Sequence, residues 1–230
     1  MTSSRPRFSN LGRACRIAAV LGLAWGPLYG CSSDSNEDWP AVFQLALTSW
    51  GARNANVSLD RAAAIPYATL GVRIGDDVEQ ILVLVTETQH ERLWASAPHL
   101  ALSTRGGRLV RTAGLAHDMS GLTTGGGPNL YWTEAHDISW TADFVDLGLY
   151  AVSILCRDEP EGPDPVTILG KQIATIRVRE DCRSEQLDWT YTNTFWVAPD
   201  SGRVWRSVQH VSPKGDVLDM EILRPPETPD

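Results

Sequence analysis

Hydrophobic and polar residues alternate in several stretches beyond residue 65, and this two-residue period predicts β-strands with one buried face. The alternation is cleanest in five runs, whose inward members are Leu70, Val72 and Ile74; Ile138, Trp140, Ala142 and Phe144; Tyr150, Val152, Ile154 and Cys156; Ala174, Ile176, Val178, Glu180 and Cys182; and Trp189, Tyr191, Asn193, Phe195 and Val197. Ile81 to Val85 is apolar at every position, so we expect a central strand there.

Turn residues separate these runs about every ten positions. Arg105-Gly106-Gly107 predicts a tight hairpin between His99–Thr104 and Arg108–Thr112, because glycine tolerates positive φ. Pro199–Gly202 predicts a second hairpin, and the proline- and acid-rich stretch Asp158–Pro165 predicts a loop. The pattern therefore indicates an all-β fold, with an antiparallel sheet folded as a sandwich or an open half-barrel.

One segment has a helical period instead. Its apolar positions lie on one helical face, with Asp38 and Pro40 at the start and Gly51 at the end; they are Trp39, Val42, Phe43, Ala46, Leu47 and Trp50. We expect one N-terminal amphipathic helix packed on the open side of the sheet. Docking on a membrane or a partner is the alternative, and the lack of basic residues disfavours the membrane.

The N-terminus has the pattern of a bacterial lipoprotein signal. Four arginines precede the short apolar stretch Ile17–Ala24, and Leu28-Tyr29-Gly30-Cys31 follows as a lipobox. We predict a signal peptide over residues 1–30, lipidation of Cys31, a tether over 31–38, a single β-rich domain over 39–224 and a flexible tail over 225–230. Ser32 stands where aspartate commonly retains such lipoproteins at the inner membrane, so we expect an outer-membrane protein facing the periplasm.

Charge narrows the range of partners. The chain has 20 basic and 28 acidic residues, and removal of the four signal-peptide arginines leaves 16 against 28, a net charge of −12. An acidic domain binds nucleic acid poorly, so we exclude nucleic acid as a partner. The membrane is a partner through the lipid anchor. Arg105, Arg108 and Arg111 could still form a local basic patch.

Two cysteines remain after Cys15 is removed with the signal and Cys31 is lipidated. Cys156 and Cys182 are an even pair in an oxidising compartment, each continuing an apolar strand face, and this predicts a disulfide. No histidine or cysteine stands at ligand spacing beside either of them, so we predict no metal site and no cofactor.

Catalytic motifs are missing from the sequence. His117-Asp118 and His136-Asp137 near Ser120 could be imagined as a nucleophilic constellation, but no spacing supports a triad, and we read them as ordinary loop residues. With 28 acidic residues, any nominated glycosidase pair carries little information. We therefore predict no catalytic residue and no enzymatic activity.

Tryptophans offer a different kind of contact. Trp196 and Trp205 fall out of phase with the inward neighbours Phe195 and Val204, so both could face away from the core. Flat aromatic faces can stack on sugars but more often fill a core. We name these two residues as candidate contacts for a glycan or a partner.

Three stretches resemble the YjbF/GfcB family of group 4 capsule and exopolysaccharide lipoproteins. They are Ile65-Pro66-Tyr67-Ala68 with the following strands; Arg105-Gly106-Gly107-Arg108-Leu109-Val110-Arg111-Thr112-Ala113-Gly114-Leu115; and Phe195-Trp196-Val197 through Val204-Trp205-Arg206-Ser207 and Gln209-His210 to Glu221-Ile222-Leu223-Arg224-Pro225. The segment from Gly125 to Pro165 is not part of the resemblance. The resemblance implies an outer-membrane lipoprotein that works with polysaccharide secretion machinery, and it supplies no catalytic residue.

The expected function is that of a non-enzymatic accessory lipoprotein in capsule or exopolysaccharide export, binding glycan or a component of the export machinery. One alternative is a polysaccharide-modifying enzyme, which an acid pair in a cleft would favour. The other is a carrier of lipid or lipoprotein, which a deep apolar cavity under the N-terminal helix would favour.

Overall fold

A computed structural model describes residues 62, 64–88, 91–97, 99–124 and 132–227. Its regular elements in these ranges are β-strands joined by turns and by two short 3₁₀ helices. The elements are β1 (Thr69–Ile74), β2 (Gln80–Glu87), β3 (Arg92–Ala95), β4 (Ala101–Arg105), β5 (Arg108–Ala113), β6 (Gly121–Thr123), β7 (His136–Phe144), η2 (Val145–Leu147), β8 (Leu149–Pro163), β9 (Val166–Ile168), β10 (Lys171–Ile173), β11 (Ile176–Ser184), η3 (Glu185–Leu187), β12 (Trp189–Val197), β13 (Val204–His210) and β14 (Val217–Arg224).

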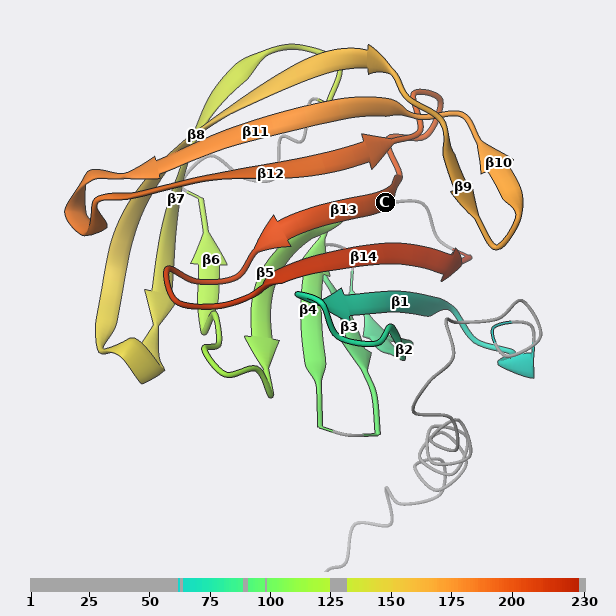
Figure 1. Ribbon diagram of the computed structural model, residues 1–230, viewed down its shortest axis with the longest axis horizontal. Helices are drawn as coiled ribbons and strands as arrows, with labels where there is room; N and C mark the ends of the chain where they lie inside the picture. The colour runs from blue at the N-terminus through green and yellow to red at the C-terminus, as the bar shows by residue number, and fades with distance from the viewer. Residues whose placement is uncertain (1–61, 63, 89–90, 98, 125–131, 228–230) are drawn as a thin grey trace, which may run out of the picture. The chain divides into compact units, whose positions relative to one another are not determined.

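Twelve of the described strands form one antiparallel sheet, in the order β5-β4-β3-β2-β1-β14-β13-β12-β11-β8-β7-β6, and β9 and β10 form a separate hairpin (Figure 1). The sheet curls until its two ends approach each other, where the Thr112 amide donates a 2.8 Å hydrogen bond to the Met119 carbonyl. The result is a nearly closed, barrel-like sheet. The predicted all-β antiparallel class is confirmed, with a single curled sheet in place of a two-sheet sandwich.

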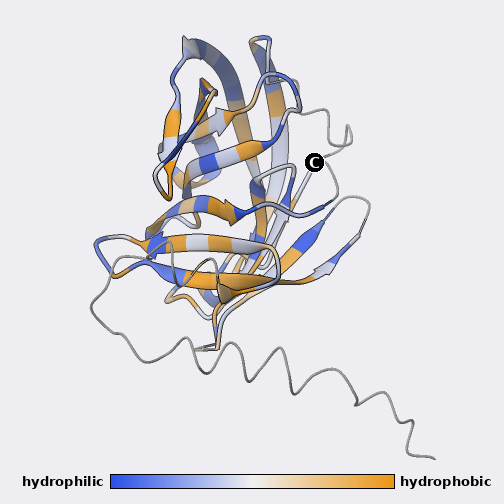
Figure 2. Cartoon of the chain, turned by 90° about the vertical axis from the view of Figure 1, so that its right-hand side faces the viewer, coloured by the Kyte–Doolittle hydropathy of each residue, from blue (hydrophilic) through white to orange (hydrophobic). Residues whose placement is uncertain are grey.

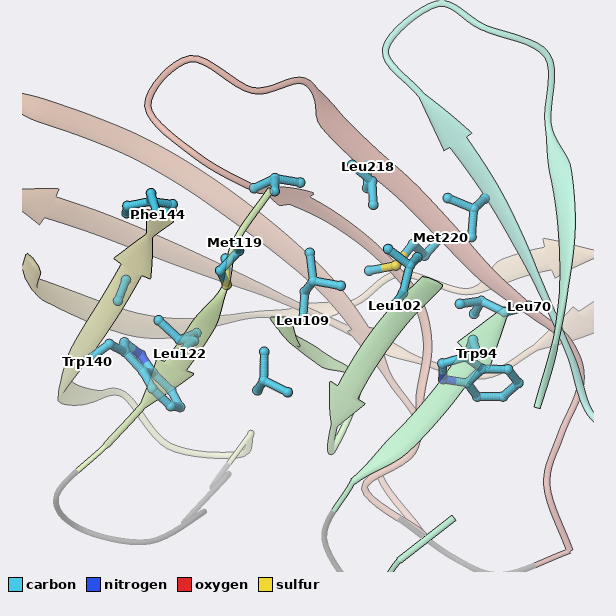
Figure 3. Packing of buried hydrophobic residues seen from close by; sticks show 14 of the residues in the cluster. Leu70, Trp94, Leu102, Leu109, Met119, Leu122, Trp140, Phe144, Leu218 and Met220 are labelled. Carbon is cyan, nitrogen blue, oxygen red and sulfur yellow. The ribbon is translucent and has the colours of Figure 1, made fainter. Parts of the chain in front are cut away.

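The interior of this sheet is filled by side chains. Hydrophobic and hydrophilic residues alternate along the strands (Figure 2). Most of the buried hydrophobic residues form one large cluster that draws on strands from both ends of the sheet, and a smaller cluster lies around Phe195. Trp94, Leu102 and Leu109 converge in the large cluster with Phe144, Leu218 and other residues (Figure 3). A gap beside Trp94 and Val204 has a volume of only about 20 Å³. Removal of this apolar surface from water is the main source of stability, at roughly 25 cal/mol per Å².

The predicted loop over Asp158–Pro165 is wrong for most of its length, because β8 continues to Pro163. Pro160 pairs with Val178 where the register of β8 and β11 shifts, and such an irregularity is one of the few places where a sheet accepts proline. Cys156 consequently lies within a fifteen-residue strand, not at a strand end, and Asp158 is fully buried.

Tyr150 also departs from the expected pattern. It was predicted to share the inward face of Val152 and Ile154, but 58% of it is exposed. Ala151 adopts a left-handed φ of 50° and donates its amide proton to the Asp143 carboxylate, so the regular alternation begins only at Val152. Local backbone geometry here overrides the sequence period.

Several predictions fall outside the described residues: the signal peptide, the lipobox with Cys31, the tether, the helix over 39–50 and the last three residues of the tail. They stay predictions. In the ranges that the structure covers, no helix has the length and apolar character needed to cross a membrane.

Candidate binding groove and the buried charges behind it

A disulfide joins two of the longest strands. Cys156 of β8 and Cys182 of β11 are direct cross-strand partners, and their sulfurs are joined. Ile138 of β7 pairs with Cys156, and Tyr191 of β12 pairs with Cys182. These four residues form one row across the sheet, which we call the disulfide row. The predicted disulfide is therefore present, and it belongs to a row of inward side chains that crosses four strands.

A groove of about 880 Å³ lies over this row. The residues on either side of each row member point the opposite way, because successive side chains of a strand alternate between faces. They are exposed and form two parallel walls on the outer face of the sheet, with the backbone of the disulfide row as the floor between them. One wall is Asp137, Arg157, Asp181 and Thr192; the other is Ser139, Leu155, Arg183 and Thr190.

The two walls differ in how far their polar groups are already engaged. In the first, Arg157 donates to Asp137 at 2.9 Å, and the Thr192 hydroxyl donates to Asp181 at 2.8 Å. In the second, the Arg183 guanidinium makes no ion pair or side-chain hydrogen bond to any described residue, and Leu155 is 46% exposed. The second wall thus offers a guanidinium, hydroxyls and an apolar side chain to a ligand.

A buried polar row lies next to the disulfide row on the inward face. It is formed by cross-strand partners of the same four strands, namely His136, Asp158, Glu180 and Asn193. Asp158 and Glu180 are both 0% exposed. The Asn193 side-chain amide donates to Glu180 at 2.8 Å, and the nearest His136 ring nitrogen lies 3.4 Å from the Asp158 carboxylate.

Arg108 supplies the positive charge that these acids require. It enters from β5, at the far end of the sheet order, donates to Glu180 and lies 3.6 Å from Asp158. Its guanidinium also sits 4.8 Å from the ring centre of Trp140 and 4.9 Å from that of Phe195. Cation–π contacts of this kind are strongest where water is excluded.

This environment changes the ionisation of two neighbouring groups. Burial is the main cause that raises the pKa of Asp158 from 3.8 to about 6; Arg108 and His136 oppose this rise, and the nearby Glu180 adds to it. Burial also raises the pKa of Tyr191, with a further contribution from Glu180. The row is thus a desolvated charge network on the opposite face of the sheet from the groove.

Neither metal binding nor acid catalysis on a ligand in the groove suits this cluster. Among the described residues, Cys156, Glu180 and Cys182 place three potential ligand atoms within 4.8 Å of one another. The two sulfurs are bonded to each other, however, and metals bind the thiolate form of cysteine, so the oxidised pair is not a metal ligand. The pair Asp158 and Glu180 is a close pair of acids, but it is fully buried and points away from the groove, so a polymer in the groove does not reach it.

The sequence stretches that carry the family resemblance meet inside the sheet. A Cβ at Gly107 would lie 2.3 Å from the Val204 Cβ, so only glycine allows the β4–β5 turn to rest on β13. The Gln209 side chain of β13 accepts the Leu109 amide proton at 2.9 Å and donates to the Gly107 carbonyl at 2.9 Å. These contacts place Arg108 against the buried acids.

The two predicted tryptophan contacts have different surroundings. Trp196 is half-buried; its indole N–H donates to Asp164 at 2.9 Å and Arg206 lies 4.9 Å from its ring centre. Trp205 packs against the main interior cluster. It is the extra residue of a bulge, since Trp196 pairs with Arg206 and Val197 pairs with Val204. A bulge re-aims side chains, which explains the departure from the sequence phase.

Sequence reasoning missed both the groove and the role of Arg108. His136 was read as a loop residue, although it begins β7 and faces Asp158. One signal was available: Glu180 and Asn193 are polar residues in otherwise inward-facing runs. A buried acid requires a partner, but the pattern could not say that the partner comes from β5.

Comparison with known proteins places the chain in a class, that of group 4 capsule polysaccharide lipoproteins. Residues 41–223 match the model of a family described as group 4 capsule polysaccharide lipoprotein gfcB, YjbF, and the chain belongs to this family. It is 24% identical over 203 residues to the uncharacterized lipoprotein GfcB of Escherichia coli (strain K12), covering 86% of this chain and 94% of that protein. The crystal structure of the hypothetical lipoprotein YmcC from Escherichia coli (K12) has the same fold, with a TM-score of 0.66 and 21% identity over 84% of this chain and all of that one.

Proposed function

We propose that this chain is a lipid-anchored accessory protein of capsule or exopolysaccharide export, held at the outer membrane on its periplasmic side and acting by binding, without catalysis. The observation that carries the proposal is membership of a family of capsule polysaccharide lipoproteins. The lipobox Leu28–Cys31 supports the anchor, because a diacylated cysteine holds a domain stably at a membrane.

The outer face of the sheet supports binding as the mode of action. The groove is walled by exposed hydroxyl, guanidinium and carboxylate groups, which suit a hydrated polymer. Trp196 lies on the same outer face of β12 as Thr190 and Thr192, and it remains a candidate contact for glycan or a component of the export machinery. Trp205, packed on the interior cluster, is better suited to a packing role.

The experiment that tests the proposal is deletion of the gene in its own host, with complementation by the full chain or by Cys31→Ser. We expect deletion to lower surface polysaccharide, the full chain to restore it, and the Cys31→Ser chain to lose membrane anchoring and restore little. Unchanged polysaccharide after deletion would contradict the export role. Palmitate labelling that persists in the Cys31→Ser chain would contradict the lipobox.

A further inference from the structure

We propose that the groove over the Cys156–Cys182 row binds a segment of an acidic polysaccharide, with Arg183 as the contact for its negative charge. This inference deepens the proposed export function by naming the ligand class and the site. The groove crosses β7, β8, β11 and β12, so it extends over three interstrand steps, or roughly 14 Å at about 4.8 Å each. Its volume of about 880 Å³ lies within the usual range of ligand sites.

The floor of the groove argues against an extended peptide. Peptides bind to sheets mainly by adding a strand at an exposed edge, where free backbone groups are available. Cys156 and Cys182, in the middle of the floor, are each paired with a strand on both sides, so their backbone is committed to the sheet. A ligand in this groove must be held by side chains, and it must bring its own hydrogen-bonding groups.

The walls carry groups that a sugar chain can contact. Ser139, Thr190 and Thr192 present hydroxyl groups, while Leu155 is the single aliphatic side chain among the eight wall residues. A glycan presents many hydroxyl groups and small apolar patches, which this mixture of polar side chains and one leucine can match.

Charge complementarity selects an acidic glycan. Asp137 is already paired with Arg157, and Asp181 is paired with Arg179 at 3.4 Å and accepts from Thr192. Arg183 is the cation of the groove that has no such partner among the described residues. A planar guanidinium binds a carboxylate by two parallel hydrogen bonds, so a uronate or another anionic substituent is the group that it fits.

The test uses the mature lipidated protein in detergent micelles. The probes are oligosaccharides cut from the host's own secreted polysaccharide and divided by anion exchange into an acidic and a neutral fraction. We expect the acidic fraction to bind more tightly and with salt-sensitive affinity. Arg183→Gln should weaken that binding by about ten-fold or more, as expected for loss of a charge-assisted bidentate contact.

Lys171→Gln is the matched control, because it removes the same charge from an exposed position on β10 outside the groove. It should leave affinity unchanged, and both variants should melt like the parent protein. Equal weakening by Arg183→Gln and Lys171→Gln, preferential binding of the neutral fraction, or no binding of either fraction would overturn the inference.

Complementation separates this inference from the proposed function. If deletion lowers surface polysaccharide but Arg183→Gln binds the acidic fraction normally, the export role stands and the groove assignment fails. If deletion has no effect on surface polysaccharide while the groove binds acidic oligosaccharides through Arg183, the site stands and the export role fails.

Discussion

At the scale of single residues, the most unusual feature is the pairing of Arg108 with two fully buried acids. Desolvation of a charge costs several kcal/mol, which a well-formed buried pair can offset, while removal of one partner leaves the other uncompensated. Arg108 contacts Glu180, Asp158 and three aromatic rings, so it is the centre of this network.

Replacement of Glu180 tests that view. Glu180→Ala leaves the Arg108 cation buried, with only Asp158 at 3.6 Å to balance it, and should lower the free energy of unfolding by about 3–5 kcal/mol. The control is Glu159→Ala on the outer face, which removes an exposed ion pair with Arg179 and should cost less than about 1 kcal/mol. Urea denaturation of both oxidised proteins measures the difference, and equal losses would contradict the network.

Asp158 gives a prediction about pH. Its pKa is raised by burial from 3.8 to about 6, so the fold favours the protonated acid. Its contribution to stability is complete below about pH 4 and is lost as the pH rises from 4 to 6. Asp158→Asn removes this titration. The free energy of unfolding of the variant should therefore rise relative to that of the parent protein over that window, by at most about 3 kcal/mol.

The measurement is the difference in unfolding free energy between the parent protein and Asp158→Asn at pH values from 4 to 7. Use of the difference removes the contributions of the other acidic residues, which both proteins share. A difference that stays constant across the window would show that the pKa of Asp158 is not raised.

At the scale of elements, the β4–β5 hairpin is held on β13 by close backbone approach. Gln209 satisfies a backbone amide and a carbonyl of the hairpin, and Gly107 leaves no room for a side chain above Val204. The two stretches around Gly107 and Gln209 that carry the family resemblance therefore contact each other, although they lie in distant parts of the chain.

Gly107→Ala should disrupt this contact. Gly107 has φ of 78° and Gly202 has φ of 71°, but only at Gly107 would a Cβ collide with a neighbour. Gly202→Ala should cost about 1–2 kcal/mol from backbone strain alone, and Gly107→Ala should cost clearly more. Val204→Ala should recover part of the excess in the double variant. Thermal denaturation that ranks the two glycine variants equally would contradict the close approach.

At the scale of the whole sheet, the disulfide ties together β8 and β11, the two middle strands of the groove. Cys156 and Cys182 are 26 positions apart and form the floor with Ile138 and Tyr191. The remaining closure, between β5 and β6, depends on the Thr112–Met119 hydrogen bond and on the side chains packed inside.

Loss of the disulfide should weaken the fold without abolishing it, because the interior cluster remains. The variant with both Cys156→Ala and Cys182→Ala should lose about 3–4 kcal/mol, the chain-entropy estimate for a loop of this length. Reduced parent protein should unfold at the same urea concentration as this variant. If reduction leaves the urea midpoint of unfolding unchanged, the disulfide does not stabilise the fold.

The sequence was sufficient to predict the strand class, the two hairpins, the disulfide pair and the family, because alternation, turn residues and motif content are local properties. It could not determine that Asp158–Pro163 extends β8, because the pairing of that segment with β11 overrides its loop-like composition. It could not place Arg108 beside Glu180, 72 positions away, or align the eight wall residues of the groove, because cross-strand register arises only when the sheet forms. Those contacts arise only in the folded sheet, because burial of the shared interior sets which strands meet and which faces remain in water.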